Sequence, residues 1–278
     1  MFPIDLIRRQ KKTYKKVLSL DGGGVRGLAS VIFLKELEKS VGKTVFELFD
    51  FFIGTSAGGL NALHFTINKT SAEELEDFWT KDNLAMSMQK SFWGQAIFLN
   101  SSPKYNNESR TELLREYFEN KLMAHSEKPV SVLAYDVEKR KPRLISSYDV
   151  SNISAISAIK ATSAAPLYYP TVKIEDGSWL IDGGVIANNP SLIGYNEAKK
   201  YFRSNNIKVF SVGTGVNRKK LDGKSSAEWG PLGWLRNDIL GILTETQYDH
   251  ETLSDLLNGN YLRVNSAMKD INFSMDDY

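Results

Sequence analysis

The sequence contains no cysteine and only three histidines among its 278 residues. Without cysteine, the chain can form no disulfide bond, thiolate nucleophile, iron–sulfur cluster or cysteine-ligated zinc site. The histidines, His64, His125 and His250, lie far apart in the sequence, which leaves little room for a histidine-rich metal site. We therefore expect neither a metal nor a cofactor.

Long hydrophobic runs are also missing. The first ten residues lack the apolar segment of a secretory signal peptide. No apolar run approaches the roughly 20 residues that a membrane-spanning helix needs. We therefore expect a cytoplasmic protein whose contact with membranes is peripheral, although export without a signal peptide would leave no mark in the sequence.

The net charge is only +2 at pH 7, but it is unevenly distributed. The first 20 residues hold six Lys and Arg residues against one Asp, so the rest of the chain is mildly acidic. Nucleic-acid binding needs a basic face on the folded body, and the sequence does not indicate one. We predict that residues 1–16 form a basic arm, either a solvated lead-in to the first strand or a segment weakly attracted to anionic lipid.

Short apolar runs alternate with longer amphipathic segments along the chain. We predict strands at residues 17–20, 51–53, 130–135, 143–147, 179–181, 207–212 and 261–264. We predict helices at residues 28–41, through Leu60, Leu63 and Ile67, from the capping boxes that start at Ser71 and Ser109, and at 154–162, 190–202 and 232–257. This alternation is typical of an α/β fold with a mostly parallel sheet covered on both faces. No Pro-, Gly- or Ser-rich linker divides the chain, so we predict one domain over residues 17–278.

A glycine-rich loop, Asp21-Gly-Gly-Gly-Val-Arg-Gly27, follows the first strand and opens a helix. Its N–H groups beside a helix N-terminus favour negative charge. Gly22, Gly24 and Gly27 match the dinucleotide fingerprint G-x-G-x-x-G, which also needs an acidic residue at the end of the second strand. Asp50 precedes that strand and so lies at the wrong end. The other interpretation is an oxyanion hole for acyl transfer.

A second motif, Gly54-Thr-Ser-Ala-Gly58, follows the strand at 51–53 and precedes a helix. A G-x-S-x-G sequence between a strand and a helix is the context of a nucleophile elbow. Such a tight turn would present the Ser56 hydroxyl at the carboxyl edge of the sheet, with Gly54 and Gly58 avoiding clashes. The adjoining helix N-terminus would favour the developing negative charge. Ser56 is therefore the predicted nucleophile.

A serine nucleophile needs a base, and the sequence offers two. Asp182 ends the strand at 179–181 and enters a second glycine turn, Gly183-Gly184, so it can meet an elbow at the carboxyl end of another strand. His250 completes the chain order of an α/β-hydrolase triad, but it lies in a polar stretch that looks helical. We favour Asp182, whose basicity partial desolvation would raise, and keep the triad as the alternative.

Four blocks follow one another in a fixed order: 21–27, 54–58, Ala161-Thr-Ser-Ala-Ala-Pro166 and Asp182-Gly-Gly184. In this order they resemble the patatin-like phospholipases, and the resemblance extends over about residues 17–215. It implies a three-layer α/β/α sandwich, and a catalytic dyad made of Ser56 and Asp182.

The same resemblance implies an oxyanion hole formed by the N–H groups of Gly22, Gly23 and Gly24. Arg26 and Gly27 would complete that loop, with Arg26 also near lipid phosphate. It implies calcium-independent hydrolysis of fatty-acyl esters in phospholipids or lysophospholipids, presented by a membrane or micelle. A protein activator is compatible with this function. The rival is a catalytically silent lipid-binding protein on the same fold.

Two segments, residues 84–99 and 229–235, are too apolar for ordinary loops. Core packing is the default interpretation for both. The alternative is a lid or rim around an acyl channel, because Trp favours membrane interfaces. The side chains expected at such a lipid interface are Phe92, Trp93, Trp229 and Trp234.

Overall fold

The computed structural model describes residues 13–90, 103–149, 152–217, 221–230, 233–234, 242, 248–268 and 276. The strands in these ranges are β1 (Lys15–Leu20), β2 (Phe51–Thr55), β3 (Val130–Asp136), β4 (Lys141–Ser146), β5 (Val172–Lys173), β6 (Trp179–Asp182), β7 (Ile207–Val212), β8 (Val216–Asn217), β9 (Tyr261–Val264) and β10 (Ala267–Met268). The α-helices are α1 (Gly27–Val41), α2 (Val45–Leu48), α3 (Ala57–Leu63), α4 (Ala72–Glu76), α5 (Lys81–Ser87), α6 (Glu108–Phe118), α7 (Ala155–Thr162), α8 (Ser191–Phe202), α9 (Gly223–Ser226) and α12 (Tyr248–Leu257).

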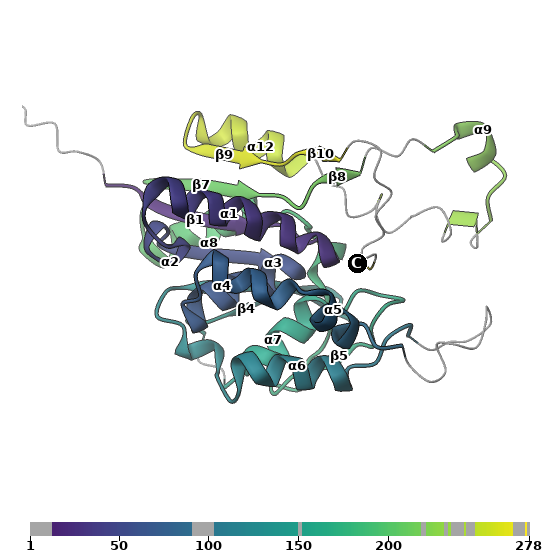
Figure 1. The fold of residues 1–278 in the computed structure, drawn as a ribbon. Helices are drawn as coiled ribbons and strands as arrows, with labels where there is room; N and C mark the ends of the chain where they lie inside the picture. The colour runs from purple at the N-terminus through teal and green to yellow at the C-terminus, as the bar shows by residue number, and fades with distance from the viewer. Residues whose placement is uncertain are drawn as a thin grey trace, which may run out of the picture.

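Eight of these strands form one central sheet (Figure 1). The strands β3, β2, β1, β7 and β9 lie side by side in this order and are parallel. The remaining strands β4, β5 and β6 pair in antiparallel fashion at one end of the sheet. The predicted mostly parallel sheet is therefore confirmed. The strands β8 and β10 form a separate parallel pair.

Side chains of the sheet alternate between two hydrophobic clusters, as the period of two along a strand requires. Leu18 and Leu20 of β1 belong to the larger cluster, together with residues of α1, α3, α6 and α7. Val17 belongs to the smaller one, together with residues of α8 and α12. Helices therefore cover both faces of the sheet, and the predicted three-layer α/β/α sandwich is confirmed (Figure 1).

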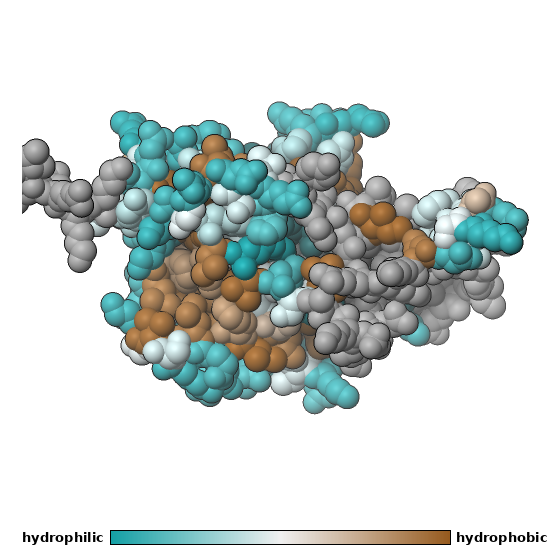
Figure 2. Space-filling model, turned by 90° about the horizontal axis from the view of Figure 1, so that it is seen from above, coloured by the Kyte–Doolittle hydropathy of each residue, from teal (hydrophilic) through white to brown (hydrophobic). Residues whose placement is uncertain are grey.

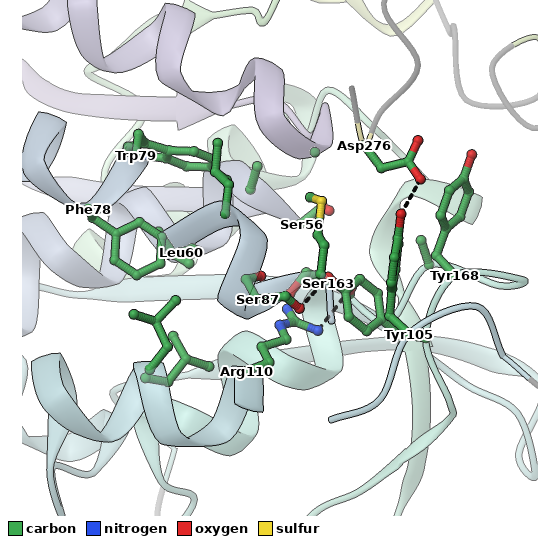
Figure 3. A pocket seen from close by; sticks show the side chains of 18 residues that line it. Ser56, Leu60, Phe78, Trp79, Ser87, Tyr105, Arg110, Ser163, Tyr168 and Asp276 are labelled. Carbon is green, nitrogen blue, oxygen red and sulfur yellow. Dashed lines mark hydrogen bonds between the residues drawn. The ribbon is translucent and has the colours of Figure 1, made fainter. Parts of the chain in front are cut away.

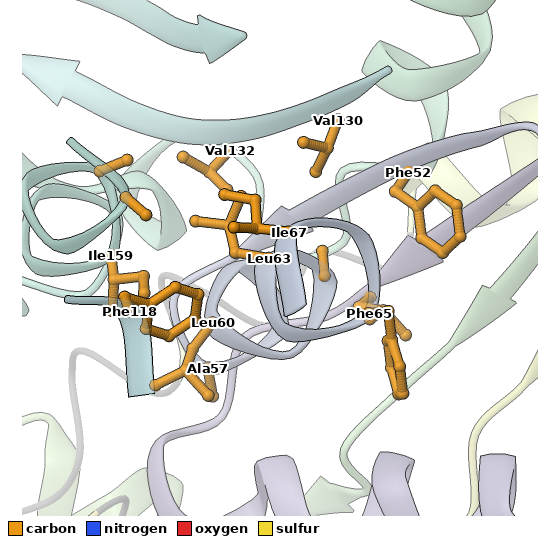
Figure 4. Packing of buried hydrophobic residues seen from close by; sticks show 14 of the residues in the cluster. Phe52, Ala57, Leu60, Leu63, Phe65, Ile67, Phe118, Val130, Val132 and Ile159 are labelled. Carbon is orange, nitrogen blue, oxygen red and sulfur yellow. The ribbon is translucent and has the colours of Figure 1, made fainter. Parts of the chain in front are cut away.

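The helix α3 is enclosed on all sides, since each of its seven residues is buried. Figure 4 shows Leu63 and the following Ile67 pointing toward Val130 and Val132 of β3, with Phe118 and Ile159 from α6 and α7 beside the helix. The helix continues as a π-helix, His64–Asn68, where the sequence pattern predicts a single α-helix. Because neighbours surround α3, the turn at its N-terminus is held in place.

Three local predictions had different outcomes. The capping box at Ser71 is confirmed, because Ser71 and Glu74 exchange both hydrogen bonds. The capping box at Ser109 is wrong: the N-cap of α6 is Asn107, two residues earlier, and the Ser109 hydroxyl donates to Gln89 instead. The first strand begins at Lys15 rather than Val17, because Asp50 pairs with Lys15 and accepts the Lys16 N–H. Two residues assigned to the basic arm thus belong to β1.

The strands β2 and β6 run toward each other along the same edge of β3. Thr55, the last residue of β2, lies opposite Leu133. Asp182, the last residue of β6, lies opposite the next residue, Ala134. The other edge of β3 is taken by β4 over residues 131–136. The carboxyl ends of β2 and β6 therefore meet. The sequence predicts this meeting from strands that end at the same edge of the sheet, whereas in the structure β6 is antiparallel to β3 and approaches β2 end to end.

The opposite end of the sheet is less covered. The strand β9 packs on α12, while its residue Leu262 is 58% exposed. Ile32 and Val41 of α1 are 45% and 49% exposed. Figure 2 shows the molecule from above the view of Figure 1. A broad apolar surface is visible on this face. Among the described helices, none is long and apolar enough to cross a bilayer.

Candidate active site

The turn between β2 and α3 has the geometry of a nucleophile elbow. Ser56 has φ 54° and ψ −123°, a backbone conformation that costs a non-glycine residue roughly 1–3 kcal/mol. A Cβ atom on Gly54 would lie 2.3 Å from the carbonyl oxygen of Gly58, and one on Gly58 would lie 2.2 Å from the carbonyl oxygen of Leu20. The backbone segments approach so closely that only glycine fits at both positions. The predicted strand–turn–helix arrangement is confirmed.

Asp182 lies where the end of β6 meets the end of β2, and it is buried, with 6% of its surface exposed. Its Oδ1 accepts the N–H of Gly184 at 2.7 Å, which explains the glycine turn that follows. Burial raises the pKa of Asp182 to about 6, although this hydrogen bond, the Ser56 hydroxyl and the Arg110 charge lower it. A carboxylate with this pKa is a stronger base than an exposed aspartate and is still ionised at neutral pH.

The block at residues 161–166 contacts both Ser56 and Asp182. The hydroxyl of Thr162 accepts the Ser56 N–H at 3.0 Å and donates to the carbonyl of Leu133 at 2.5 Å. The carbonyl of Ala164 accepts the Asp182 N–H at 3.0 Å. In the sequence, this block serves only as one of the four motifs that carry the family resemblance. Its hydrogen bonds show that it positions both Ser56 and Asp182.

Two N–H groups of the glycine loop, rather than the expected three, can donate a hydrogen bond to an oxyanion. The N–H of Gly22 donates to the carbonyl of Asn188 at 3.0 Å, so this donor is already used. The carbonyl of Gly22 accepts the Thr214 hydroxyl at 2.7 Å. Among the described residues, the N–H groups of Gly23 and Gly24 have no acceptor. Gly24, with φ 58°, lines the same pocket as Ser56.

The other residues of the loop have structural contacts. A Cβ atom on Gly27 would lie 2.6 Å from the Trp79 ring, so glycine allows α1 to pack closely there. The Arg26 Nε donates to the carbonyl of Gly23 at 3.4 Å. Arg26 lines a second pocket, between α1 and β7, and not the one that holds Ser56.

An ion pair ties the start of the loop to the far edge of the sheet. Arg263 of β9 donates to both carboxylate oxygens of Asp21, at 3.1 and 2.5 Å, and to the Ser211 hydroxyl at 2.6 Å. Both partners are largely buried, with side chains 12% and 4% exposed. A bidentate arginine–carboxylate pair fixes orientation as well as distance. Residues beyond the four motif blocks thus hold the glycine loop.

Ser56 opens into a pocket with two unlike ends (Figure 3). On one side of Ser56 lie the apolar side chains of Leu60, Phe78 and Trp79, and Leu84, Leu113 and Leu114 also line the pocket. On the other side lie Tyr105, Tyr168 and Asp276. The apolar wall suits a fatty-acyl chain, and the opposite side suits a polar group attached to it.

Arg110 is a site residue that sequence reasoning missed. It lies on α6, is 6% exposed and donates to the hydroxyl and carbonyl oxygens of Ser163. Its guanidinium lies 4.4 Å from the centroid of the Tyr169 ring. Its positive charge lowers the pKa of Asp182 and so opposes the effect of burial.

None of the histidines lines the pocket that holds Ser56. His64 is buried against Phe118, and burial lowers its pKa to about 3. His125 accepts the N–H of Leu122. The Nδ1 of His250 lies 3.2 Å from the hydroxyl of Tyr261 on β9, at the edge of the sheet. The structure does not bring His250 to Asp182.

The residues expected at a lipid interface are only partly described. Phe92 and Trp93 lie outside the described residues. The rings of Trp229 and Trp234 pack edge to face, with centroids 5.3 Å apart. Within the first apolar segment, Leu84 and Met88 line the pocket beside Ser56. Contact of the four aromatic residues, Phe92, Trp93, Trp229 and Trp234, with lipid stays a prediction.

The family model of patatin-like phospholipases matches residues 18–193. The chain belongs to the patatin-like phospholipase family. Patatin-like protein 4 of Arabidopsis thaliana is 29% identical over 94% of this chain and 78% of its own length. Patatin-like protein 2 of the same plant is 32% identical over 80% of this chain and 65% of its own length. This membership favours the acyl-transfer interpretation of the glycine loop over the dinucleotide one.

A bacterial relative is similar over most of both chains. The cGAMP-activated phospholipase of Pseudomonas aeruginosa (strain BWHPSA011 / Pa011) is 27% identical over 89% of this chain and 77% of its own length. Among solved structures, that of VipD from Legionella pneumophila has a TM-score of 0.47 and 15% identity, over 95% of this chain and 63% of VipD. Within the described part of the patatin-like chain, no group of three or more His, Asp and Glu side chains is placed to hold a metal ion.

The bridge made by Thr162 can be tested by Thr162→Val. Valine has nearly the same shape but no hydroxyl, so it leaves the Ser56 N–H and the Leu133 carbonyl unpaired in a buried place. We expect the free energy of unfolding to fall by roughly 1–3 kcal/mol in urea denaturation. Thr162→Ser, which keeps the hydroxyl, is the control and should lose clearly less. Equal losses in the two variants would contradict the role of the hydrogen bonds.

Proposed function

We propose that this protein is a serine lipid acyl hydrolase that cleaves fatty-acyl ester bonds of phospholipids or lysophospholipids. One observation carries the proposal: the strained Ser56 faces the buried carboxylate of Asp182 where β2 and β6 meet, at the wall of a pocket with an apolar end. A nucleophile, a base and an acyl-binding surface are what ester hydrolysis by acyl transfer requires.

In the first step the Ser56 oxygen attacks the ester carbonyl, and Asp182 takes the serine proton. The N–H groups of Gly23 and Gly24 donate to the oxyanion of the tetrahedral intermediate. The intermediate collapses to the acyl-enzyme, and Asp182 returns the proton to the leaving alcohol. In the second step a water molecule attacks the ester carbonyl of the acyl-enzyme while Asp182 takes a proton from that water. The fatty acid leaves, and Ser56 regains its proton.

Asp182 serves as the base without histidine. Its pKa of about 6 is close enough to neutral pH for proton transfer in both directions. His250 is engaged with Tyr261 at the edge of the sheet, away from this pocket. The triad alternative therefore has less support than the dyad.

The reaction is proposed to be independent of calcium and to take place with peripheral contact to a membrane or micelle. Ser56, Asp182 and the glycine-loop N–H groups supply the nucleophile, the base and the oxyanion donors, so no step is left for a metal ion. The apolar wall of Leu60, Phe78 and Trp79 would accept the acyl chain that leaves the lipid surface.

Active-site labelling separates the hydrolase from a catalytically silent lipid-binding protein. We expect a fluorophosphonate probe to label the protein at Ser56 and to leave Ser56→Ala unlabelled.

We expect Asp182→Asn to lower kcat for a phospholipid ester by roughly 10²–10⁴-fold, the usual contribution of a general base, and His250→Ala to change it little. The matched control is Asp136→Asn, since Asp136 is also buried and also accepts backbone N–H groups. The assay is release of fatty acid, with and without EDTA.

Two results would count against this assignment. A folded protein that the probe does not label would favour the silent lipid-binding protein. A loss of activity in His250→Ala as large as that in Asp182→Asn would favour the triad.

The pH dependence of hydrolysis follows from the raised pKa of Asp182. Below about pH 6 the carboxylate is protonated and cannot accept the serine proton, so kcat/KM should fall about tenfold per pH unit and be level above it. Arg110→Met removes a positive charge that lowers this pKa, so the break should move to higher pH. A short-chain ester that does not titrate is the suitable substrate. A profile that stays level down to pH 4, near the usual aspartate pKa, would contradict the account.

A further inference from the structure

Two polar side chains that the proposed mechanism does not use, Tyr105 and Asp276, line the pocket that holds Ser56, and Lys104 contacts Asp276 from beside that pocket. Lys104 Nζ lies 2.5 Å from Oδ2 of Asp276, and the Tyr105 hydroxyl donates to the same oxygen at 2.5 Å. Figure 3 shows the contact between Tyr105 and Asp276 on the side of Ser56 opposite to Trp79. The Asp276 side chain is only 9% exposed, so its carboxylate is largely shielded from water.

Lys104 and Tyr105 are held rigidly. Their N–H groups donate to the carbonyls of Leu167 and Tyr168, at 3.0 and 2.8 Å, directly after the block that positions the dyad. The Lys104 ammonium lies 5.2 and 5.6 Å from the ring centroids of Tyr105 and Tyr168, within the range of a cation–π interaction. The backbone of both residues is therefore anchored, and the Lys104 ammonium lies beside two aromatic rings.

These two donors suit an oxyanion. Burial and the neighbouring Asp276 raise the pKa of Tyr105, so its hydroxyl stays protonated and remains a donor. An ammonium and a phenol that converge on one oxygen match a phosphate or carboxylate group. Asp276 itself shows that an anion fits, since one of its carboxylate oxygens accepts from both donors.

We propose that Lys104 and Tyr105 bind the phosphate of the lipid substrate, and that Asp276 is an internal competitor for the same site. The proposal rests on the proposed function. With the acyl chain against the apolar wall and the ester at Ser56, the alcohol part of the lipid extends toward Tyr105 and Tyr168. A phosphate in that position has to displace the Asp276 carboxylate, because both need the same donors. The chain thereby favours phosphate-bearing lipids over neutral esters and restrains its own activity.

A double-mutant cycle with two substrates tests this. The substrates are a short-chain phosphatidic acid and the diacylglycerol with the same acyl chains, both below their aggregation limits. We expect Asp276→Asn to lower KM several-fold for the phosphatidic acid and to leave the diacylglycerol unchanged. Lys104→Met in the Asp276→Asn background should raise KM for the phosphatidic acid about tenfold, the effect of losing one charge-assisted hydrogen bond at a half-exposed site. In the Lys104→Met background, Asp276→Asn should have little further effect.

The control is Asp176→Asn, which breaks an ion pair with Arg143 in the β5–β6 region and should change neither KM. If Lys104→Met changes both substrates alike, the residue shapes the pocket and the phosphate site is wrong. If Asp276→Asn has no effect on the phosphatidic acid, the competition is wrong.

Binding to the Ser56→Ala variant separates this proposal from the hydrolase itself. We expect Ser56→Ala to bind the phosphatidic acid in calorimetry, and binding to weaken about tenfold when Lys104→Met is added. This result supports the phosphate site even if no ester is ever hydrolysed. Inorganic phosphate should bind at least tenfold more weakly than the lipid, because it leaves the apolar wall empty. Equal binding of the two would overturn the assignment to a lipid head group.

Discussion

The site depends on the meeting of two strand ends. The strands β2 and β6 approach each other along one edge of β3. Backbone pairing therefore places Ser56 next to Asp182, and no long side chain is needed to bring them together. A serine hydroxyl and an aspartate carboxyl are among the shortest groups that can form a nucleophile–base pair. Such a pair works only if the backbone positions it closely, and the register of β3 does this.

The same arrangement explains the basicity of Asp182. The meeting point lies inside the sandwich, so the carboxylate is removed from water and its pKa rises. The N–H of Gly184 and the charge of Arg110 oppose this rise and keep the pKa from going further. The strained backbone of Ser56 is tolerated because α3 is surrounded by packed side chains and because Thr162 holds the Ser56 N–H. Burial thus raises the basicity of Asp182 and stabilises the strained turn.

Features that depend on local backbone geometry were predictable from the sequence. The elbow at Ser56 follows from glycines spaced around a serine between a strand and a helix, and the parallel sheet follows from the alternation of apolar patterns. The direction of β6 was not predictable, because strand pairing is a tertiary property. Nor does the glycine motif show that the N–H of Gly22 donates to Asn188, more than 160 positions away.

The charged residues of the site were the hardest to predict. Arg110 lies in an amphipathic helix, where an arginine is normally solvated, and its burial depends on Ser163 at the end of α7, 53 residues away. Arg263 pairs with Asp21 over 242 residues and lies beyond residues 18–193, which the family model matches. Lys104 and Asp276 are likewise 172 residues apart. A sequence pattern reports neighbours along the chain, and none of these pairs are neighbours in that sense.

The central claim is that Ser56, Asp182 and the glycine loop form one acyl-transfer site. The most direct test is a crystal structure of the protein after reaction with an alkyl fluorophosphonate. The account predicts a phosphorus atom bonded to the Ser56 oxygen, with one phosphoryl oxygen about 2.7–3.1 Å from the N–H groups of Gly23 and Gly24 and the alkyl chain against Leu60 and Phe78. An adduct on another residue, or a phosphoryl oxygen directed away from the glycine loop, would contradict it.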